Sequence, residues 1–261
     1  AEHGEAARVA PYLGTYYYAL NHTDPILADP EVRQALSMVI DREFLADEIF
    51  QGTMVAATSF VPPGIGNYAT GSPEVEYFGM SMLDREDKAA EILEAKGITP
   101  DSPVTIEIMY NTSENHKNAA TAIADMWSAF GVNVEYNVRD ASDHYANLRA
   151  KGDFDVARAG WIGDYSDPQN FLFMVESDND GFNYANYAYA EYDALMDKAA
   201  AITDLEERSD VLQEAEGVFM RDLPFIPLLY YSSRSLVSPQ LLCWEDIFQN
   251  VLPSRFLSLD G

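Results

Sequence analysis

The arrangement of apolar residues between positions 104 and 138 limits the possible folds of this chain most strongly. Apolar and polar side chains alternate over residues 104–110, apolar ones recur at helical spacing through Ile123 and Trp127, and alternation returns over residues 132–138. Alternation indicates a half-buried strand, and a spacing of 3.6 residues indicates an amphipathic helix. The segment therefore predicts a βαβ unit, whose crossover helix makes the two strands parallel.

A third strand is predicted at residues 154–161, and it leads into the loop GDYSDP. In open α/β sheets, ligands bind beyond the carboxyl ends of the strands. The loops that follow strands 104–110 and 154–161 should therefore lie at one edge of the sheet. These loops carry three candidate binding residues, His116, Trp161 and Asp164.

The rest of the sequence predicts further helices and strands around this unit. Asp29 before a proline is a helix start signal, Asp41 can cap a second helix with Phe44 facing inward, and Gly97 is placed to end a third helix. The predicted strands are residues 14–21 and 225–237, and the predicted helices begin near residues 30, 42, 84, 142, 191 and 205. Residues 53–80, rich in proline and glycine, predict one long ordered loop. The expected fold class is α/β, with a mixed sheet flanked by helices.

The charge of the chain excludes several classes of partner. There are 43 Asp and Glu against 16 Lys and Arg, a net charge of −27. Because this charge repels phosphate backbones and anionic lipids, we expect no nucleic acid and no membrane surface as a partner. The acidic residues are spread along the chain, which favours a solvated surface over a dedicated cation site. The single cysteine, Cys243, excludes an intramolecular disulfide and predicts a small, partly buried apolar side chain.

Motifs for enzyme chemistry and for cofactors are absent from the sequence. It contains no GxSxG, no Walker loop and no HExxH. The acidic run at residues 176–181 imitates the start of a calcium loop. However, it begins with Glu176 instead of Asp, and its twelfth position is Tyr187 where a bidentate glutamate is required. We therefore expect no metal, no cofactor and no catalytic residues.

Five segments resemble the extracytoplasmic oligopeptide- and dipeptide-binding proteins of ABC importers, solute-binding protein family 5. They are PYLGTYYYALN, DPEVRQALSMVIDREFL, YNTSENHKNAA, DVARAGWIGDYSDP and FIPLLYYSSRSLVSP. The resemblance implies a type II periplasmic-binding-protein-like lobe, as a fragment of a two-lobed receptor. Residues 1–16 would be a connector from a missing N-terminal lobe, residues 17–231 the peptide-binding lobe, and residues 232–261 a segment that returns to the missing lobe. The implied partners are short peptides and the membrane permease subunits of the importer, and the implied location is periplasmic or extracytoplasmic.

The resemblance also implies roles for individual residues near the third strand. Asp164 takes the position that binds the α-ammonium of a peptide. Gly160, Trp161 and Ile162 lie on the strand that pairs with the peptide backbone, and Arg158 matches an arginine available to the carboxyl end. These residue types suit the chemistry, since an ammonium needs a carboxylate, a carboxylate needs a cation, and an extended backbone needs a strand edge.

Further matches lie elsewhere in the chain. His116 matches a histidine that serves longer peptides, Tyr12 and Tyr17 match aromatic pocket positions, and Tyr231 and Asn183 are looser matches. Because side chains alternate along a strand, Tyr17 should lie on the opposite face from the tyrosines on either side of it.

Each main candidate also has a purely structural interpretation. Asp164 can cap a turn, and Trp161 can belong to the core. Arg158 can pair with one of the many carboxylates, and His116 can be a surface residue whose pKa is lowered by the helix dipole. A non-peptide solute, such as a metal chelate or a sugar, remains open as the ligand. A hydrolase that uses Asp164, Asp167 and His116 is disfavoured because no nucleophile accompanies them.

Overall fold

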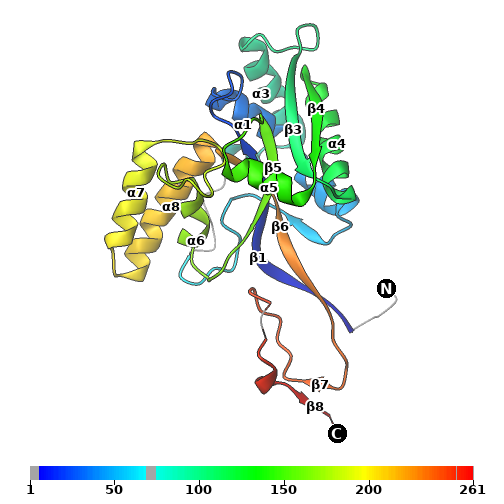
Figure 1. Cartoon of the computed structure of the whole chain (residues 1–261), viewed down its shortest axis with the longest axis vertical. Helices are drawn as coiled ribbons and strands as arrows, with labels where there is room; N and C mark the ends of the chain where they lie inside the picture. Colours follow the sequence, from blue (N-terminus) through cyan, green and yellow to red (C-terminus); the bar gives the residue numbers. More distant parts are fainter. Residues whose placement is uncertain (1–5, 69–74, 251, 261) are drawn as a thin grey trace.

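A mixed six-stranded sheet forms the centre of the computed structural model, which describes residues 6–68, 75–250 and 252–260 (Figure 1). The strand order is β2-β6-β1-β5-β3-β4. The strands are β1 (Ala7–Leu20), β2 (Met54–Ala56), β3 (Val104–Asn111), β4 (Val132–Arg139), β5 (Val156–Ile162) and β6 (Phe225–Leu236). β3 is parallel to β4 and β5, whereas β1 is antiparallel to β5 and β6. The predicted βαβ unit and the α/β fold class are confirmed.

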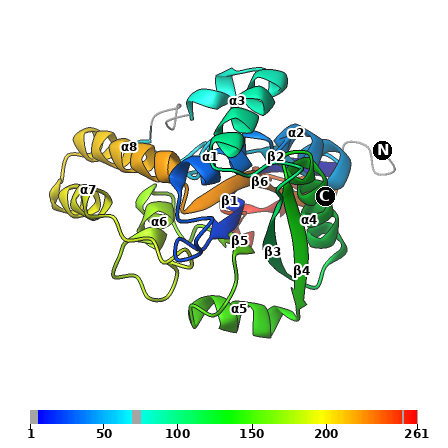
Figure 2. The same cartoon turned by 90° about the horizontal axis from the view of Figure 1, so that it is seen from above.

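Helices cover both faces of the sheet, and Figure 2 shows α7 and α8 on one side of it and α4 on the other. The helices are α1 (Pro30–Met38), α2 (Arg42–Phe44), α3 (Met82–Ala95), α4 (Glu114–Ser128), α5 (Ala141–Arg149), α6 (Gln169–Leu172), α7 (Ala190–Ala201) and α8 (Leu205–Asp222). One buried cluster packs α6, α7 and α8 against the face that bears Tyr17. The other packs α1, α3 and α4 against the face that bears Tyr16 and Tyr18. The predicted alternation of the tyrosines is confirmed.

Most helices begin and end at the predicted signals. The carboxylates of Asp29 and Asp41 each accept a backbone N–H of the helix that follows, at 2.9 Å. Gly97, just after α3, has the left-handed φ of 78° that a C-cap glycine adopts. α5 begins at Ala141, close to the predicted start near residue 142, and Asp140 caps it, because its carboxylate accepts the N–H three residues further on.

The prediction of one long loop for residues 53–80 is wrong in part. Met54–Ala56 forms the edge strand β2, which pairs with β6, and Glu76–Gly79 forms a short 3₁₀-helix. Residues 69–74 lie outside the described residues. The proline and glycine content of the segment hides a strand of only three residues, too short to show alternation.

The second predicted helix is short and changes its geometry. α2 continues as the π turn Leu45–Ile49, in which the Phe50 N–H bonds to the Leu45 carbonyl at 2.9 Å. Leu45, the first residue of this turn, is buried. The prediction for Phe44 is wrong, because this side chain is 42% exposed.

β1 and β6 extend beyond the other strands of the sheet (Figure 1). Residues 7–11 pair with residues 232–236, and this ribbon leads to the C-terminal segment, where β7 (Leu241–Leu242) pairs with β8 (Ser258–Leu259). Within the described ranges, no helix is both long and apolar enough to cross a membrane. The domain boundaries at residues 16 and 232 stay a prediction.

Candidate ligand-binding site

Arg158 is the centre of a polar cluster on β5. Its buried guanidinium donates to Asn111 Oδ1 at 3.1 Å, to the Tyr145 hydroxyl at 3.0 Å and to the Tyr231 hydroxyl at 3.1 Å. Among the described residues no carboxylate forms an ion pair with it. Burial opposes its charge, but the oxygens of Tyr16, Tyr231 and Tyr145 outweigh burial, and the pKa of Arg158 lies above its usual range. The site therefore contains a buried cation surrounded by neutral acceptors.

Tyr16 joins Arg158 to His116. The central carbon of the guanidinium lies 4.7 Å from the centre of the Tyr16 ring, and the Tyr16 hydroxyl lies 3.2 Å from His116 Nδ1. Tyr16 belongs to β1, and His116 to the first turn of α4. Sequence analysis missed Tyr16. Strand pairing could have found it, because Tyr16 lies opposite Gly160 in the register of β1 and β5.

The two histidines beside Arg158 are neutral at physiological pH. Burial, and then the charge on Arg158, lowers the pKa of His116 to about 3. His144 Nε2 donates to the Arg158 carbonyl at 2.8 Å, and burial lowers the pKa of His144 as well. Desolvation and a neighbouring cation, rather than a helix dipole at the surface, therefore account for the state of His116. The neutral imidazole of His116 can form a hydrogen bond with a ligand but carries no charge.

Among the described residues, one edge of β5 has no strand partner over its second half. β3 pairs with β5 only at residues 156 and 157. The Gly163 N–H donates to the Leu13 carbonyl on the β1 side, and backbone groups alternate between the two edges of a strand. The N–H and C=O groups of Gly160 and Ile162 therefore point to the unpaired edge. Such an edge can accept an extended chain as an added strand.

Gly160 gives space to the polar cluster. A Cβ at this position would lie 2.4 Å from the Tyr231 hydroxyl oxygen. The absence of a side chain at Gly160 therefore allows Tyr231 to reach Arg158.

Trp161 contributes to both the strand end and the core. Its indole Nε1 donates to the Asn170 carbonyl at 2.7 Å, and its ring packs against Phe173 and Phe182 with edge-to-face geometry. Trp161 as a whole is only partly buried. The structural interpretation of Trp161 is therefore correct in part, and part of the residue remains accessible.

Asp164 lies in a braced loop immediately after β5. Its backbone N–H lies 3.4 Å from Asn170 Oδ1, and the neighbouring Asp167 forms a two-pronged ion pair with Arg208 at 2.8 and 3.0 Å. The Asp164 side chain itself is exposed and forms no ion pair within the described part of the chain. Asp167, by contrast, also accepts the Gln169 N–H at 2.8 Å, as a capping residue does. Capping thus belongs to Asp167, and Asp164 keeps a free carboxylate.

Three predicted residues have no contact with the Arg158 cluster. Tyr17 is fully buried on the opposite face of the sheet, where it stacks on Phe225 with ring centres 4.5 Å apart. Asn183 is buried, and its amide is used locally, because it donates to the Tyr187 carbonyl at 2.6 Å and accepts the N–H of the same residue. Tyr12 is half-buried where the pairing of β1 with β6 is irregular. These positions stay predictions, and Tyr17 and Asn183 have evident structural roles.

The described residues, the acidic run at residues 176–181 included, give no sign of a metal site. In the described residues, no three His, Cys, Asp or Glu side chains are grouped so that they could hold an ion. Burial, reinforced by Asp178, raises the pKa of Glu176 to about 7.

Cys243 is exposed, so the prediction of a partly buried cysteine is wrong.

Comparison with known proteins gives a consistent result. The family model described as "Bacterial extracellular solute-binding proteins, family 5 Middle" matches residues 2–183. The chain is 35% identical over 238 residues to the periplasmic oligopeptide-binding protein OppA of Escherichia coli, covering 90% of this chain and 43% of that protein. It is 34% identical over 233 residues to the periplasmic murein peptide-binding protein MppA of the same species, covering 88% and 42%.

Solved structures agree with these relatives. The murein tripeptide-binding protein MppA of Escherichia coli superposes with a TM-score of 0.86 at 31% identity, over 98% of this chain and 50% of that one. Haemophilus influenzae OppA in complex with the peptide RPPGFSPFR superposes with a TM-score of 0.86 at 29% identity, over 99% and 50%. The chain thus spans about half the length of the relatives that it matches.

Proposed function

The chain belongs to the bacterial extracellular solute-binding proteins of family 5, and we propose from this that it is part of a receptor that captures short peptides for an ABC importer. The receptor works outside the cytoplasm, in the periplasm, and delivers its ligand to membrane permease subunits. A second lobe, outside this sequence, closes over the ligand. The receptor binds its ligand and does not transform it.

The observation that carries this proposal is a pair of opposite charges at the two ends of an unpaired strand edge. Arg158 is buried and Asp164 is exposed, neither forms an ion pair with a described residue, and they are six residues apart on β5 and its loop. Six extended residues span roughly 20 Å. With the reach of both side chains, an extended peptide of about three to five residues fits between them, with its ammonium at Asp164 and its carboxylate at Arg158.

The backbone of such a peptide has a partner between these charges. The free N–H and C=O groups of Gly160 and Ile162 provide the hydrogen bonds of an added strand, and the exposed part of Trp161 lies against the peptide. His116 contributes a neutral hydrogen bond near the carboxyl end. Because these contacts use groups that every peptide has, they place little restriction on sequence.

The named relatives support peptides and leave one alternative. OppA of Haemophilus influenzae is solved with a nonapeptide, and MppA is named for a murein tripeptide. Another relative, 30% identical over 234 residues, is named as a probable deoxycholate-binding periplasmic protein of Escherichia coli. An anionic amphiphile of that kind would use Arg158 and leave Asp164 without a partner, so a test of Asp164 separates the two ligand classes.

Calorimetric titration with trialanine, N-acetyl-trialanine and trialanine amide tests the proposal on the longer receptor that contains this chain. Both blocked peptides should bind more weakly than trialanine, because a buried charge left without its partner costs about 3 to 5 kcal/mol. The variant Asp164→Asn should lose the preference for a free amino terminus, whereas Asp178→Asn, at an exposed acid elsewhere, should keep it. Equal affinity for the free and acetylated peptides would contradict the assignment. On the present chain alone we expect weak binding, since an open site leaves the charge pairs in water.

A further inference from the structure

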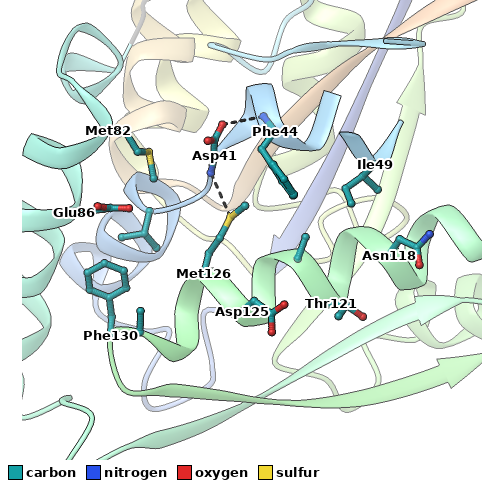
Figure 3. A pocket seen from close by; sticks show the side chains of 13 residues that line it. Asp41, Phe44, Ile49, Met82, Glu86, Asn118, Thr121, Asp125, Met126 and Phe130 are labelled. Carbon is teal, nitrogen blue, oxygen red and sulfur yellow. Dashed lines mark hydrogen bonds between the residues drawn. The ribbon is translucent and has the colours of Figure 1, made fainter. Parts of the chain in front are cut away.

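A second cavity lies between α4, the π turn after α2 and the start of α3 (Figure 3). Its volume is about 710 Å³, within the range of small-molecule sites. α4 lines it from Asn118 to Met126, which corresponds to about 12 Å of helix at 1.5 Å per residue, and Ala129 and Phe130 line it just after the helix ends. In Figure 3, Asn118 and Ile49 lie at one end, and Phe130 and Met82 lie at the other. The cavity is therefore an elongated groove, and none of its lining residues belongs to the Arg158 cluster.

The π turn shapes one wall of the groove. Phe44 and Ile49 both line it although they are five residues apart. On an α-helix, residues three or four apart share a side. The wider hydrogen-bond spacing of the π turn brings residues five apart to one side instead, and such turns are frequent at functional sites. The Asp41 N–H lies 3.4 Å from the sulfur of Met126, which joins the start of α2 to the floor formed by α4.

The charged groups of the groove all have one sign. Asp41, Glu86 and Asp125 line it, and among the described residues no Lys, Arg or His does. The Asp41 carboxylate caps Phe44, whereas those of Glu86 and Asp125 form no ion pair with any described residue. Apolar walls with carboxylates at the rim are complementary to an apolar body that carries a positive charge.

We propose that this groove binds a small amphipathic cation, an ammonium group on an alkyl or aryl body, independently of the peptide site. The apolar body lies against Phe44, Met126 and Phe130, and the ammonium lies near Glu86 and Asp125. The volume of about 710 Å³ suits a small molecule. A single hydrocarbon chain or an aromatic ring fits.

Titration of this chain with 4-phenylbutylammonium, followed by calorimetry and by NMR of the methionine methyl groups, tests the proposal. The neutral 4-phenylbutanol and the anionic 4-phenylbutyrate are matched in shape. We expect the ammonium to bind most tightly, at one site, with affinity that falls as salt is added. The methyl signals of Met82 and Met126 should shift. Equal binding of the three compounds, or shifts that leave these two signals unchanged, would overturn the proposal.

Charge variants distinguish the groove from general attraction to an acidic protein. Glu86→Gln should weaken binding of 4-phenylbutylammonium by up to about fivefold, the range of a partly exposed ion pair. Asp87→Asn removes the same charge at an exposed neighbour outside the groove and should have no effect. Equal losses in the two variants would refute a specific site.

A filling variant tests the cavity itself. Ala122→Trp places an indole in the groove and should abolish binding while circular dichroism shows the native helix content. If that variant unfolds, Thr121→Phe, at an exposed lining residue, replaces it. Retained affinity in a folded filling variant would show that the ligand binds elsewhere.

Discussion

Two buried ionisable groups differ in whether they can become neutral. Glu216 is fully buried, and it accepts hydrogen bonds from the Ser59 hydroxyl, the Val61 N–H and the Tyr68 hydroxyl. Burial raises its pKa, so this group can become neutral by taking up a proton. Arg158 cannot lose its proton. Its charge persists against neutral partners, which is why an anionic ligand group is its natural counterpart.

Arg158→Lys should damage both stability and binding. A lysine ammonium lacks the planar fork that reaches Asn111, Tyr145 and Tyr231 together. We expect the free energy of unfolding to fall by at least about 1.5 kcal/mol, the value of one hydrogen bond to a charged group. Urea denaturation measures this, with the exposed Arg234→Lys as the control. A variant as stable as the parent would show that the three contacts contribute nothing.

The histidines predict a stability that falls with acidification. The pKa of His116 and that of His22 are each lowered to about 3, first by burial and then by Arg158 and Arg33 respectively. The unfolded chain binds protons at these groups near pH 6.5, whereas the folded chain does not. Stability is therefore complete above pH 6.5 and is lost as the pH falls from there towards 3.

Comparison of His116→Gln with the parent chain isolates this effect. Glu176, whose pKa is raised to about 7, acts in the opposite direction between pH 4.5 and 7, and it is common to both proteins. The stability of the variant relative to the parent should improve between pH 7 and pH 5, by at most about 1.4 kcal/mol per pH unit. Urea midpoints at several pH values measure it. A difference that does not change with pH would mean that His116 titrates normally in the folded protein.

At the scale of elements, β5 combines two environments in seven residues. Its first half lies between β1 and β3 and is buried, while its second half keeps β1 and loses β3. The strand thereby carries a core residue such as Ala157 and an exposed one such as Ile162 on a single rigid element. A site built on such a strand is held more precisely than one built on a loop alone.

Alanine substitutions at two glycines, one just after a helix and one inside a helix, should change the stability of the chain in opposite directions. Gly97 lies just after α3 and has a φ of 78°. An alanine in this left-handed conformation destabilises the fold by about 1 kcal/mol. Gly217 lies inside α8 with no atom within 4 Å of an added Cβ, so alanine there should stabilise by about 0.5 to 1 kcal/mol. Thermal melts should show a lower Tm for Gly97→Ala and a higher one for Gly217→Ala. Changes of the same sign would contradict the capping assignment.

At the scale of the whole molecule, the ribbon of β1 and β6 and the C-terminal segment carry exposed apolar side chains. They include Leu236, Leu242, Phe256 and Leu259. We propose that these groups pack against a second lobe in a longer receptor, as the half-length match to the relatives suggests.

This chain by itself should consequently self-associate. Exposed apolar groups beside short strand edges favour pairing between copies. Light scattering at high salt, which screens the net charge of −27, should show a mass that rises with concentration. Leu242→Ser combined with Leu259→Ser should reduce the rise. A mass that stays monomeric at every concentration would show that the segment is adequately covered.

The sequence by itself determined most of the elements and the general location of the candidate site. Alternation and helical spacing depend on neighbouring residues, so the βαβ unit, the caps at Asp29 and Asp41 and the loop after β5 could all be predicted. The parallel direction of β3 and β5 then brings His116 and Arg158 to one edge. Local patterns carry this information because each depends on only a few consecutive residues.

Only the tertiary structure decided which side chains meet. Tyr16 rather than Tyr17 contacts Arg158, because the pairing of β1 with β5 selects the face. The amide of Asn183 is used within its own loop, and the π turn exposes Phe44. The contact of Tyr16 with Arg158 depends on packing between segments about 140 residues apart in sequence. Periodicity along the chain contains no information about such distances.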